Sequence, residues 1–139
     1  MNIKSLINKI LRKDPNMEPN LCYSQNGEDL ILNRLIGDKK KGFYIDVGAH
    51  HPIRFSNTHF FYKKGWSGIN IDAMPGSMKL FKNIRKRDIN LETGVGFKKG
   101  TSRYYQFNDP ALNTFEPKEV KKKTNTNYKL INSLNLKVD

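Results

Sequence analysis

The hydrophobic positions of the chain change their period from one segment to the next, and this pattern predicts a mixed α/β protein. Residues 3–12 place isoleucine and leucine at helical spacing among lysines, which predicts a short, basic amphipathic helix. The prolines and charged residues of 13–20 interrupt that spacing and predict a linker. We therefore expect an N-terminal helix and linker over 1–20 and one further domain over 21–139.

Within that domain, segments of helical period alternate with short apolar runs that are typical of buried strands. Helices are predicted at 26–36, capped by Asn26, from 56 or 57 to 62, and at about 76–86. Strands are predicted at 43–47, 68–71 and 89–95, with a hairpin partner for the third strand at 102–107. Further on we expect a polar loop at 116–127 and short strands at 128–131 and 134–138. This order predicts a parallel sheet, the first half of a doubly wound nucleotide-binding domain.

The charge of the chain has two explanations. Its 139 residues include 25 Lys and Arg against 13 Asp and Glu, a formal net charge of +12. Such a charge is typical of nucleic-acid or membrane binding, so a small basic nucleic-acid-binding protein is one hypothesis. We favour A/T-rich codon bias, because the chain has 19 Lys and 16 Asn but only 6 Arg, the residue that nucleic-acid readers prefer. The basic residues of the predicted helix 76–86 are expected to form a solvated face: Lys79, Lys82, Arg85 and Lys86.

The single cysteine, Cys22, excludes an internal disulfide framework and a cysteine-based zinc site. The N-terminus lacks the continuous apolar core of a signal peptide, and no apolar run reaches the roughly 18–20 residues of a membrane span. We therefore expect a soluble, cytoplasmic protein.

Two acids and one glycine stand where the predicted parallel strands end, which is where such folds bind ligands. Gly48 follows the first strand and would let the backbone approach a ligand closely. Asp72 ends the second strand and suits an acid that accepts hydrogen bonds from ribose hydroxyls, unless it caps the following helix. Asp46 could hold a cationic group such as a ligand ammonium, or it could cap the backbone N–H groups of its own loop.

The loop at 48–52 argues against a dinucleotide cofactor. A dinucleotide fingerprint needs three glycines so that the backbone can cradle a pyrophosphate, and this loop has one. S-adenosylmethionine contains adenosine without phosphate and presents an ammonium group. One glycine beside an acid therefore favours S-adenosylmethionine over NAD.

Five segments, in this order and spacing, resemble the FkbM family of methyltransferases: YSQNGED (23–29), YIDVGAHHP (44–52), SNT (56–58), GWSGINIDA (65–73) and DINLETGVG (88–96). The likeness extends from about Tyr23 to Phe115. It implies a class I, Rossmann-like methyltransferase fold with S-adenosylmethionine as cofactor. It also implies methyl transfer to an oxygen, on a sugar, glycan, polyketide-type or similar small acceptor.

The resemblance implies a set of cofactor-binding residues: Gln25, Asp46, Gly48, Ala49, His50, Asn57, Asp72, Ala73, Val95 and Gly96. Asp46, Gly48 and His50 would flank the methionine part of the cofactor, and Asp72 would bind its ribose. Segment 95–96 would lie beside the adenine.

The resemblance also implies that four residues lie over the pocket and touch cofactor or acceptor: Gln25, Asn26, Glu28 and Asp29. Helix capping is an equal alternative for Asn26 and Asp29. The catalytic base is left open among three candidates: Glu28, His50 and His51. No metal is expected, because adjacent histidines rarely ligate one ion together and no cysteine lies nearby.

Two departures from the family pattern affect the prediction. Phe97 stands near the place where related sequences often have an aspartate for the adenine, and the motif of a fourth strand is missing before Asp139. We therefore expect a partial methyltransferase domain that is truncated before its fourth strand, binds cofactor weakly and is inactive. The first strand would expose an edge that favours self-association, and a non-catalytic remnant that binds a partner there is a third hypothesis.

Overall fold

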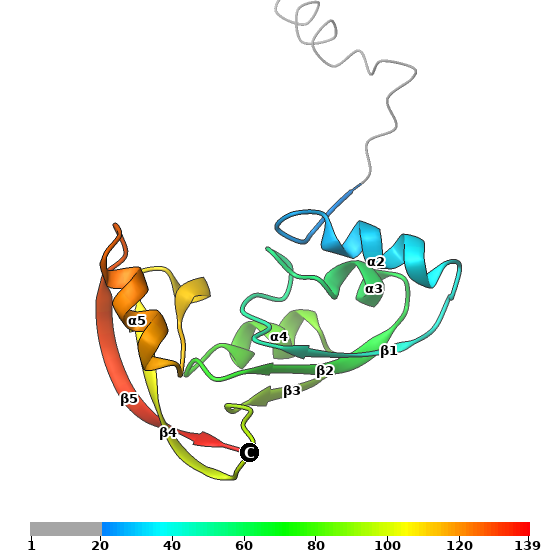
Figure 1. Ribbon diagram of the computed structural model, residues 1–139. Helices are drawn as coiled ribbons and strands as arrows, with labels where there is room; N and C mark the ends of the chain where they lie inside the picture. Colours follow the sequence, from blue (N-terminus) through cyan, green and yellow to red (C-terminus); the bar gives the residue numbers. More distant parts are fainter. Residues whose placement is uncertain (1–20) are drawn as a thin grey trace, which may run out of the picture.

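The computed structural model describes residues 21–139, so the helix and linker predicted for 1–20 lie outside the described residues. The described chain forms a parallel sheet with three helices, followed by a long antiparallel ribbon with a further helix (Figure 1). The predicted mixed α/β class is confirmed.

The parallel sheet has the spatial order β1–β2–β3 and consists of β1 (Phe43–Val47), β2 (Ser67–Asp72) and β3 (Ile89–Glu92). Helices α3 (His59–Lys63) and α4 (Met78–Ile84) connect the strands. The predicted alternation of strands and helices is therefore confirmed, although both helices are shorter than predicted. Gly76 adopts a left-handed φ of 83°, which delays the start of α4.

Helix α2 (Glu28–Ile36) ends at Gly37 as predicted, but Gly27 and not Asn26 occupies its N-cap position. The fully buried Asp29 organises this end of the helix. Its carboxylate accepts hydrogen bonds from the backbone N–H of Tyr23 and from the hydroxyl of Ser24, both at 2.7 Å. Asp29 therefore ties the segment before α2 to the first turn of the helix, whose N-cap position has no side-chain hydrogen bond.

The antiparallel ribbon corrects three predictions. Strand β4 (Gly100–Phe107) pairs with β5 (Leu130–Val138) and not with β3, and β5 is one strand where two were predicted. The 3-10 turn η1 (Pro110–Leu112) and helix α5 (Pro117–Thr124) lie between them, so the predicted loop at 116–127 is wrong. Helix α5 buries no residue and shows no apolar stripe, but Glu116 caps its first turn and lysines occupy its last turn.

The end of the ribbon returns to the parallel sheet. β3 ends at Glu92, three residues before the predicted end, and the chain then bends to pair with the C-terminal end of β5. The backbone N–H of Gly94 donates to the carbonyl of Lys137, and the backbone N–H of Asp139 donates to the carbonyl of Gly94, both at 3.1 Å. These bonds join the ribbon to the carboxyl end of β3.

The two faces of the parallel sheet differ in polarity. Tyr44, Asp46, Gly68 and Asn70 alternate with apolar neighbours and lie on the face that α3 and α4 cover. A Cβ at Gly68 would overlap the ring and the carbonyl oxygen of Tyr44, so this close strand pairing requires glycine. The opposite face carries large apolar side chains that are 41–63% exposed: Phe43, Ile45, Val47, Ile89 and Leu91. The prediction that 43–47 is buried is therefore wrong for its apolar residues.

The apolar core is correspondingly small. Ala49, Met78 and Phe81 form its buried cluster, where α4 packs on the loop after β1. The rings of Phe61 and Trp66 add a second contact, with centroids 5.0 Å apart. Core packing therefore holds α4 to the loop of the predicted ligand site and α3 to the residue that precedes β2.

Candidate functional site

A pocket of about 230 Å³ lies at the carboxyl ends of the three parallel strands. The sheet contributes one wall: Val47, Gly48, His50, Ile71, Asp72, Ala73, Thr93, Gly94 and Val95. The chain in and after β4 contributes the opposite wall: Tyr104, Pro110, Ala111, Asn113, Thr114 and Phe115. This is the edge of a parallel sheet at which such folds bind ligands.

Gly48 forms the turn at the end of β1. Its φ of 77° favours glycine, and a Cβ added there would meet no atom within 4 Å. The backbone N–H groups of Gly48 and Ala49 both donate to the carbonyl of Ile71, at 2.9 and 3.0 Å. The loop is thus fixed to the end of β2, with open space above Gly48.

Asp72 joins the loops that follow β1 and β2. One carboxylate oxygen accepts a hydrogen bond from the backbone N–H of His50 and the other from that of Met74, both at 2.8 Å. Asp72 therefore holds the turn that leads towards α4, but it does not cap that helix as the alternative predicted, because the N-cap position of α4 is Ser77. Each carboxylate oxygen offers two acceptor positions, so each keeps one for a ligand hydroxyl.

Asp46 does not line this pocket and lies half-buried on the helix-covered face. Its Oδ2 accepts a hydrogen bond from the hydroxyl of Thr58 at 2.8 Å, so the predicted capping of backbone N–H groups is wrong. Burial raises the pKa of the Asp46 carboxyl. The hydrogen bond from Thr58 and the charge of Arg85 reduce this rise but do not cancel it. No other hydrogen bond to Asp46 is found among residues 21–139.

The three histidines have different environments. The Nδ1 atom of His51 accepts hydrogen bonds from two backbone N–H groups of its own loop, at 2.9 and 3.1 Å. His59 is buried, and its Nδ1 lies 3.4 Å from the guanidinium of Arg85. Burial and the charge of Arg85 lower the pKa of His59 to about 4, so this imidazole is neutral near pH 7. Of the three histidines, His50 is the one that lines the pocket.

The predicted cofactor residues fall into two groups. Those that line the pocket are Gly48, His50, Asp72, Ala73 and Val95. Those that do not are Gln25, Asp46, Ala49, Asn57 and Gly96. Among the second group, Ala49 belongs to the core cluster, Gly96 lies against Val138, and Gln25 and Asn57 are exposed.

No residue of 25–29 lines the pocket at the strand ends. The carboxylate of Glu28 accepts a hydrogen bond from the backbone N–H of Asn26 at 2.9 Å. This bond lowers the pKa of Glu28. A carboxylate with a lowered pKa is a weak proton acceptor, so this contact favours a capping role over a catalytic one.

The wall formed by 104–115 is absent from the predicted site. Tyr104 is buried, and the centroid of its ring lies 4.8 Å from the centroid of the Phe115 ring. Burial raises the pKa of Tyr104 to about 12. Asn113 holds the same segment, since its side-chain oxygen accepts a hydrogen bond from the backbone N–H of Phe107 at 2.8 Å. The Asp-Pro sequence at 109–110 signals a turn, but no local pattern indicates that this turn faces the strand ends.

Comparison with known families bears on this pocket. A family model described as the Methyltransferase FkbM domain matches residues 46–137, which include every residue that lines the pocket. The chain belongs to the FkbM methyltransferase family. The predicted resemblance is therefore confirmed, and the match extends beyond 115 to cover most of the ribbon. Searches of curated proteins and of solved structures found no match.

Two further observations on this FkbM chain concern its described residues. Within 21–139, no helix is both long and apolar enough to cross a bilayer. The same residues contain no group of three or more His, Cys, Asp or Glu side chains placed to hold a metal ion.

Proposed function

We propose that this chain is an S-adenosylmethionine-dependent methyltransferase, in which 21–139 form a partial domain of the class I, Rossmann-like fold. The family match supports methyl transfer, and the β1–β2–β3 order with a pocket at the strand ends supports the fold. Doubly wound folds carry helices on both faces, whereas α3 and α4 both cover one face here.

The lone cysteine, a free thiol at Cys22, agrees with a cytoplasmic location.

The residues at the strand ends suit this cofactor. Open space above Gly48 allows close approach to the backbone, and the free acceptor positions of Asp72 suit a ribose diol. The pocket volume of about 230 Å³ is smaller than the roughly 300–1,000 Å³ typical of ligand pockets. The pocket would therefore enclose the nucleoside, and the amino-acid part would extend past Gly48 towards Asp46.

We propose an acceptor oxygen, on a sugar, glycan or similar small molecule, as the methylated atom. When bound, S-adenosylmethionine supplies a methyl group on a positively charged sulfur. The acceptor oxygen would form a bond to that methyl carbon as the carbon–sulfur bond breaks, and a base would take the hydroxyl proton. His50 is the best placed candidate base, because it lines the pocket and a ring nitrogen of a neutral imidazole can accept a proton.

Calorimetric titration with S-adenosylhomocysteine tests the cofactor assignment. We expect wild-type protein to bind, and Asp72→Asn to bind at least about tenfold more weakly, since a lost charged hydrogen bond is worth about 1.5–3 kcal/mol. Asp38→Asn, an equivalent change at an exposed acid outside the pocket, is the matched control and should bind as wild type. Equal affinity of all three proteins would contradict the role of Asp72.

No finding supports the alternative of a nucleic-acid-binding protein. That alternative predicts DNA affinity that falls steeply with salt and is insensitive to Asp72→Asn. The methyltransferase proposal predicts instead that Asp72→Asn weakens the binding of the cofactor.

We further propose self-association through the exposed edge of the parallel sheet at β1 and the apolar face beside it. Two observations support it: β1 has β2 as its one strand partner among residues 21–139, and the exposed apolar side chains of β1 and β3 lie on one face of the sheet. Sedimentation velocity over a range of concentrations should show Ile45→Thr shifted towards monomer. Ile31→Thr on α2, where the isoleucine is 60% exposed against 63% for Ile45, is the control. Monomeric wild-type protein at all concentrations would contradict the proposal.

A further inference from the structure

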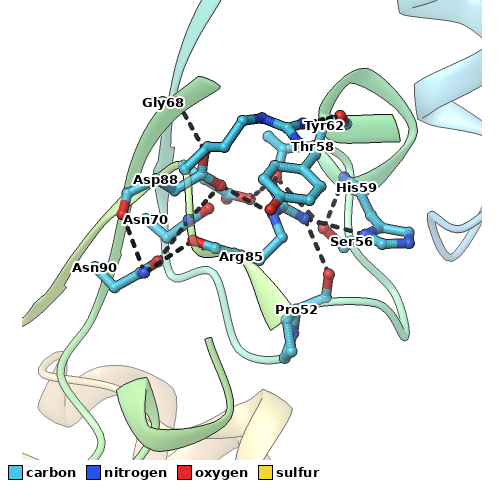
Figure 2. Close-up of polar contacts among 12 residues, drawn as sticks. Pro52, Ser56, Thr58, His59, Tyr62, Gly68, Asn70, Arg85, Asp88 and Asn90 are labelled. Carbon is cyan, nitrogen blue, oxygen red and sulfur yellow. Dashed lines mark hydrogen bonds and ion pairs between the residues drawn. The ribbon is translucent and has the colours of Figure 1, made fainter. Parts of the chain in front are cut away.

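Arg85 is the centre of a buried polar network, although its position on the predicted outer face of 76–86 suggested a solvated side chain. It follows the last residue of α4, and its side chain is fully buried between α3 and the polar face of the sheet (Figure 2). Its Nε donates to Asp88 Oδ2 at 2.9 Å and forms an ion pair. The expectation of a solvated face is therefore wrong for Arg85.

The other guanidinium nitrogens reach two elements near the pocket. One donates to the backbone carbonyl of Pro52, in the loop after β1, at 2.9 Å. The second donates to the hydroxyls of Tyr44 and Thr58, at 2.9 and 2.8 Å. A guanidinium has donors only, so each of these oxygens acts as the acceptor.

This constraint sets the direction of the next hydrogen bond. Because the Thr58 hydroxyl oxygen accepts from Arg85, its proton is free to point to Asp46, whose Oδ2 lies 2.8 Å away. The chain of bonds runs from Arg85 through Thr58 to Asp46. It fixes one oxygen of the Asp46 carboxylate and leaves the other without a partner among the described residues.

Stability alone is a weak reason for this arrangement. A buried ion pair such as Arg85–Asp88 is often replaceable by apolar residues of similar volume without loss of stability. Here the network also includes the donors Gly68 and Asn70, which satisfy Asp88 at 3.0 and 2.9 Å. Asp88 neutralises the guanidinium and occupies its Nε side. The remaining nitrogens face β1, the loop that leads to α3, and His59 at the start of α3.

We propose that Arg85 is a positioning residue of the cofactor site, which orients Asp46 through Thr58 and holds the pocket loop through the Pro52 carbonyl. This inference rests on the proposed function, in which Asp46 faces the ammonium group of the cofactor. Arg85 touches neither cofactor nor acceptor in this scheme. Its effect is to pre-organise a carboxylate for a cationic ligand group.

Variants of Thr58 test the proposal, because Arg85→Lys risks unfolding the chain. Thr58→Val keeps the shape of the side chain and removes the hydroxyl, whereas Thr58→Ser restores the hydroxyl. We would titrate each folded variant with S-adenosylhomocysteine and, separately, with adenosine, which lacks the amino-acid part. Thr58→Val should weaken binding of S-adenosylhomocysteine about tenfold without changing adenosine binding, and Thr58→Ser should restore it.

Tyr44→Phe is the matched control, since it removes another hydroxyl bonded to Arg85 that makes no bond to Asp46. It should lower stability and leave both affinities unchanged. The positioning role would be overturned if Thr58→Val bound S-adenosylhomocysteine as tightly as wild type. It would also be overturned if Thr58→Val lost as much affinity for adenosine, or if Tyr44→Phe lost as much affinity for S-adenosylhomocysteine. Wild-type protein that binds neither ligand would instead contradict the proposed function, and the positioning role with it.

Discussion

The two faces of the parallel sheet differ in both polarity and exposure, although the same strands form them. On β1, Tyr44 and Asp46 point to the helices and are half-buried, whereas Phe43, Ile45 and Val47 point away from them and are largely exposed. The helix-covered face is held by the buried Arg85–Asp88 pair and its hydrogen bonds (Figure 2). The polar face thus carries the contacts that lead to the pocket, and the apolar face is the one beside which we propose self-association.

This difference teaches that burial and apolar character need not coincide in a sheet beside a ligand pocket. A polar group buried without a partner costs free energy, so most donors and acceptors on the helix-covered face should be paired, and the side-chain oxygen of Asn70 is an exception. Asp88 meets this condition with four donors: Tyr44, Gly68, Asn70 and Arg85. Changes on this face should therefore cost far more than changes on the open one.

The largest expected effect is the loss of Asp88. Asp88→Ala leaves the charge of Arg85 buried without its partner, which typically costs about 3–5 kcal/mol. Urea denaturation would measure the change in the free energy of unfolding. The control is Glu119→Ala, which breaks the exposed pair with Lys122 on α5 and should change little. Equal effects of the two substitutions would contradict the importance of the buried pair.

A smaller effect concerns pH, because His59 belongs to the same buried network. Its pKa is about 4 in the folded chain, below its ordinary value, so the unfolded chain binds the proton more tightly. The contribution of His59 to stability is complete above about pH 6.5 and is lost as the pH falls towards 4, by up to about 3 kcal/mol. Thermal unfolding of wild type and His59→Gln across this range should show a steeper decline for wild type. Identical slopes would contradict a neutral, buried His59.

The smallest effects come from a matched pair on neighbouring residues of β1. Tyr44→Phe removes a buried hydroxyl that bonds to both Arg85 and Asp88, and should cost about 1–3 kcal/mol. Phe43→Tyr adds the same hydroxyl on the open face and should change stability by less than about 0.5 kcal/mol. Chemical denaturation of both variants compares the faces directly. A larger cost for Phe43→Tyr would reverse the comparison.

The sequence predicted the elements whose signals are local. The apolar runs of β1, β2 and β3 and the glycines at 37 and 48 indicate the sheet, the end of α2 and the pocket turn. The position of Asp72 at a strand end was enough to place it in the pocket wall. These predictions depend on periodicity and strand order, which the neighbouring residues determine.

The remaining features depend on contacts between distant segments. The pocket wall at 104–115 forms because β4 pairs with β5 and β5 returns to Gly94, neither of which has a local signature. Arg85 resembles its solvated lysine neighbours in sequence and is distinguished by its tertiary partners alone. Helix α5 lacks an apolar stripe, so hydrophobic periodicity could not reveal it.

The central claim is that the carboxyl end of the parallel sheet binds S-adenosylmethionine. Two-dimensional amide NMR during titration with the unreactive product, S-adenosylhomocysteine, tests it most directly. We predict saturable shifts concentrated at residues of both pocket walls: Gly48, His50, Ala73, Thr93, Val95, Asn113 and Thr114. An unchanged spectrum at saturating ligand, or shifts confined to residues outside this pocket, would contradict the account.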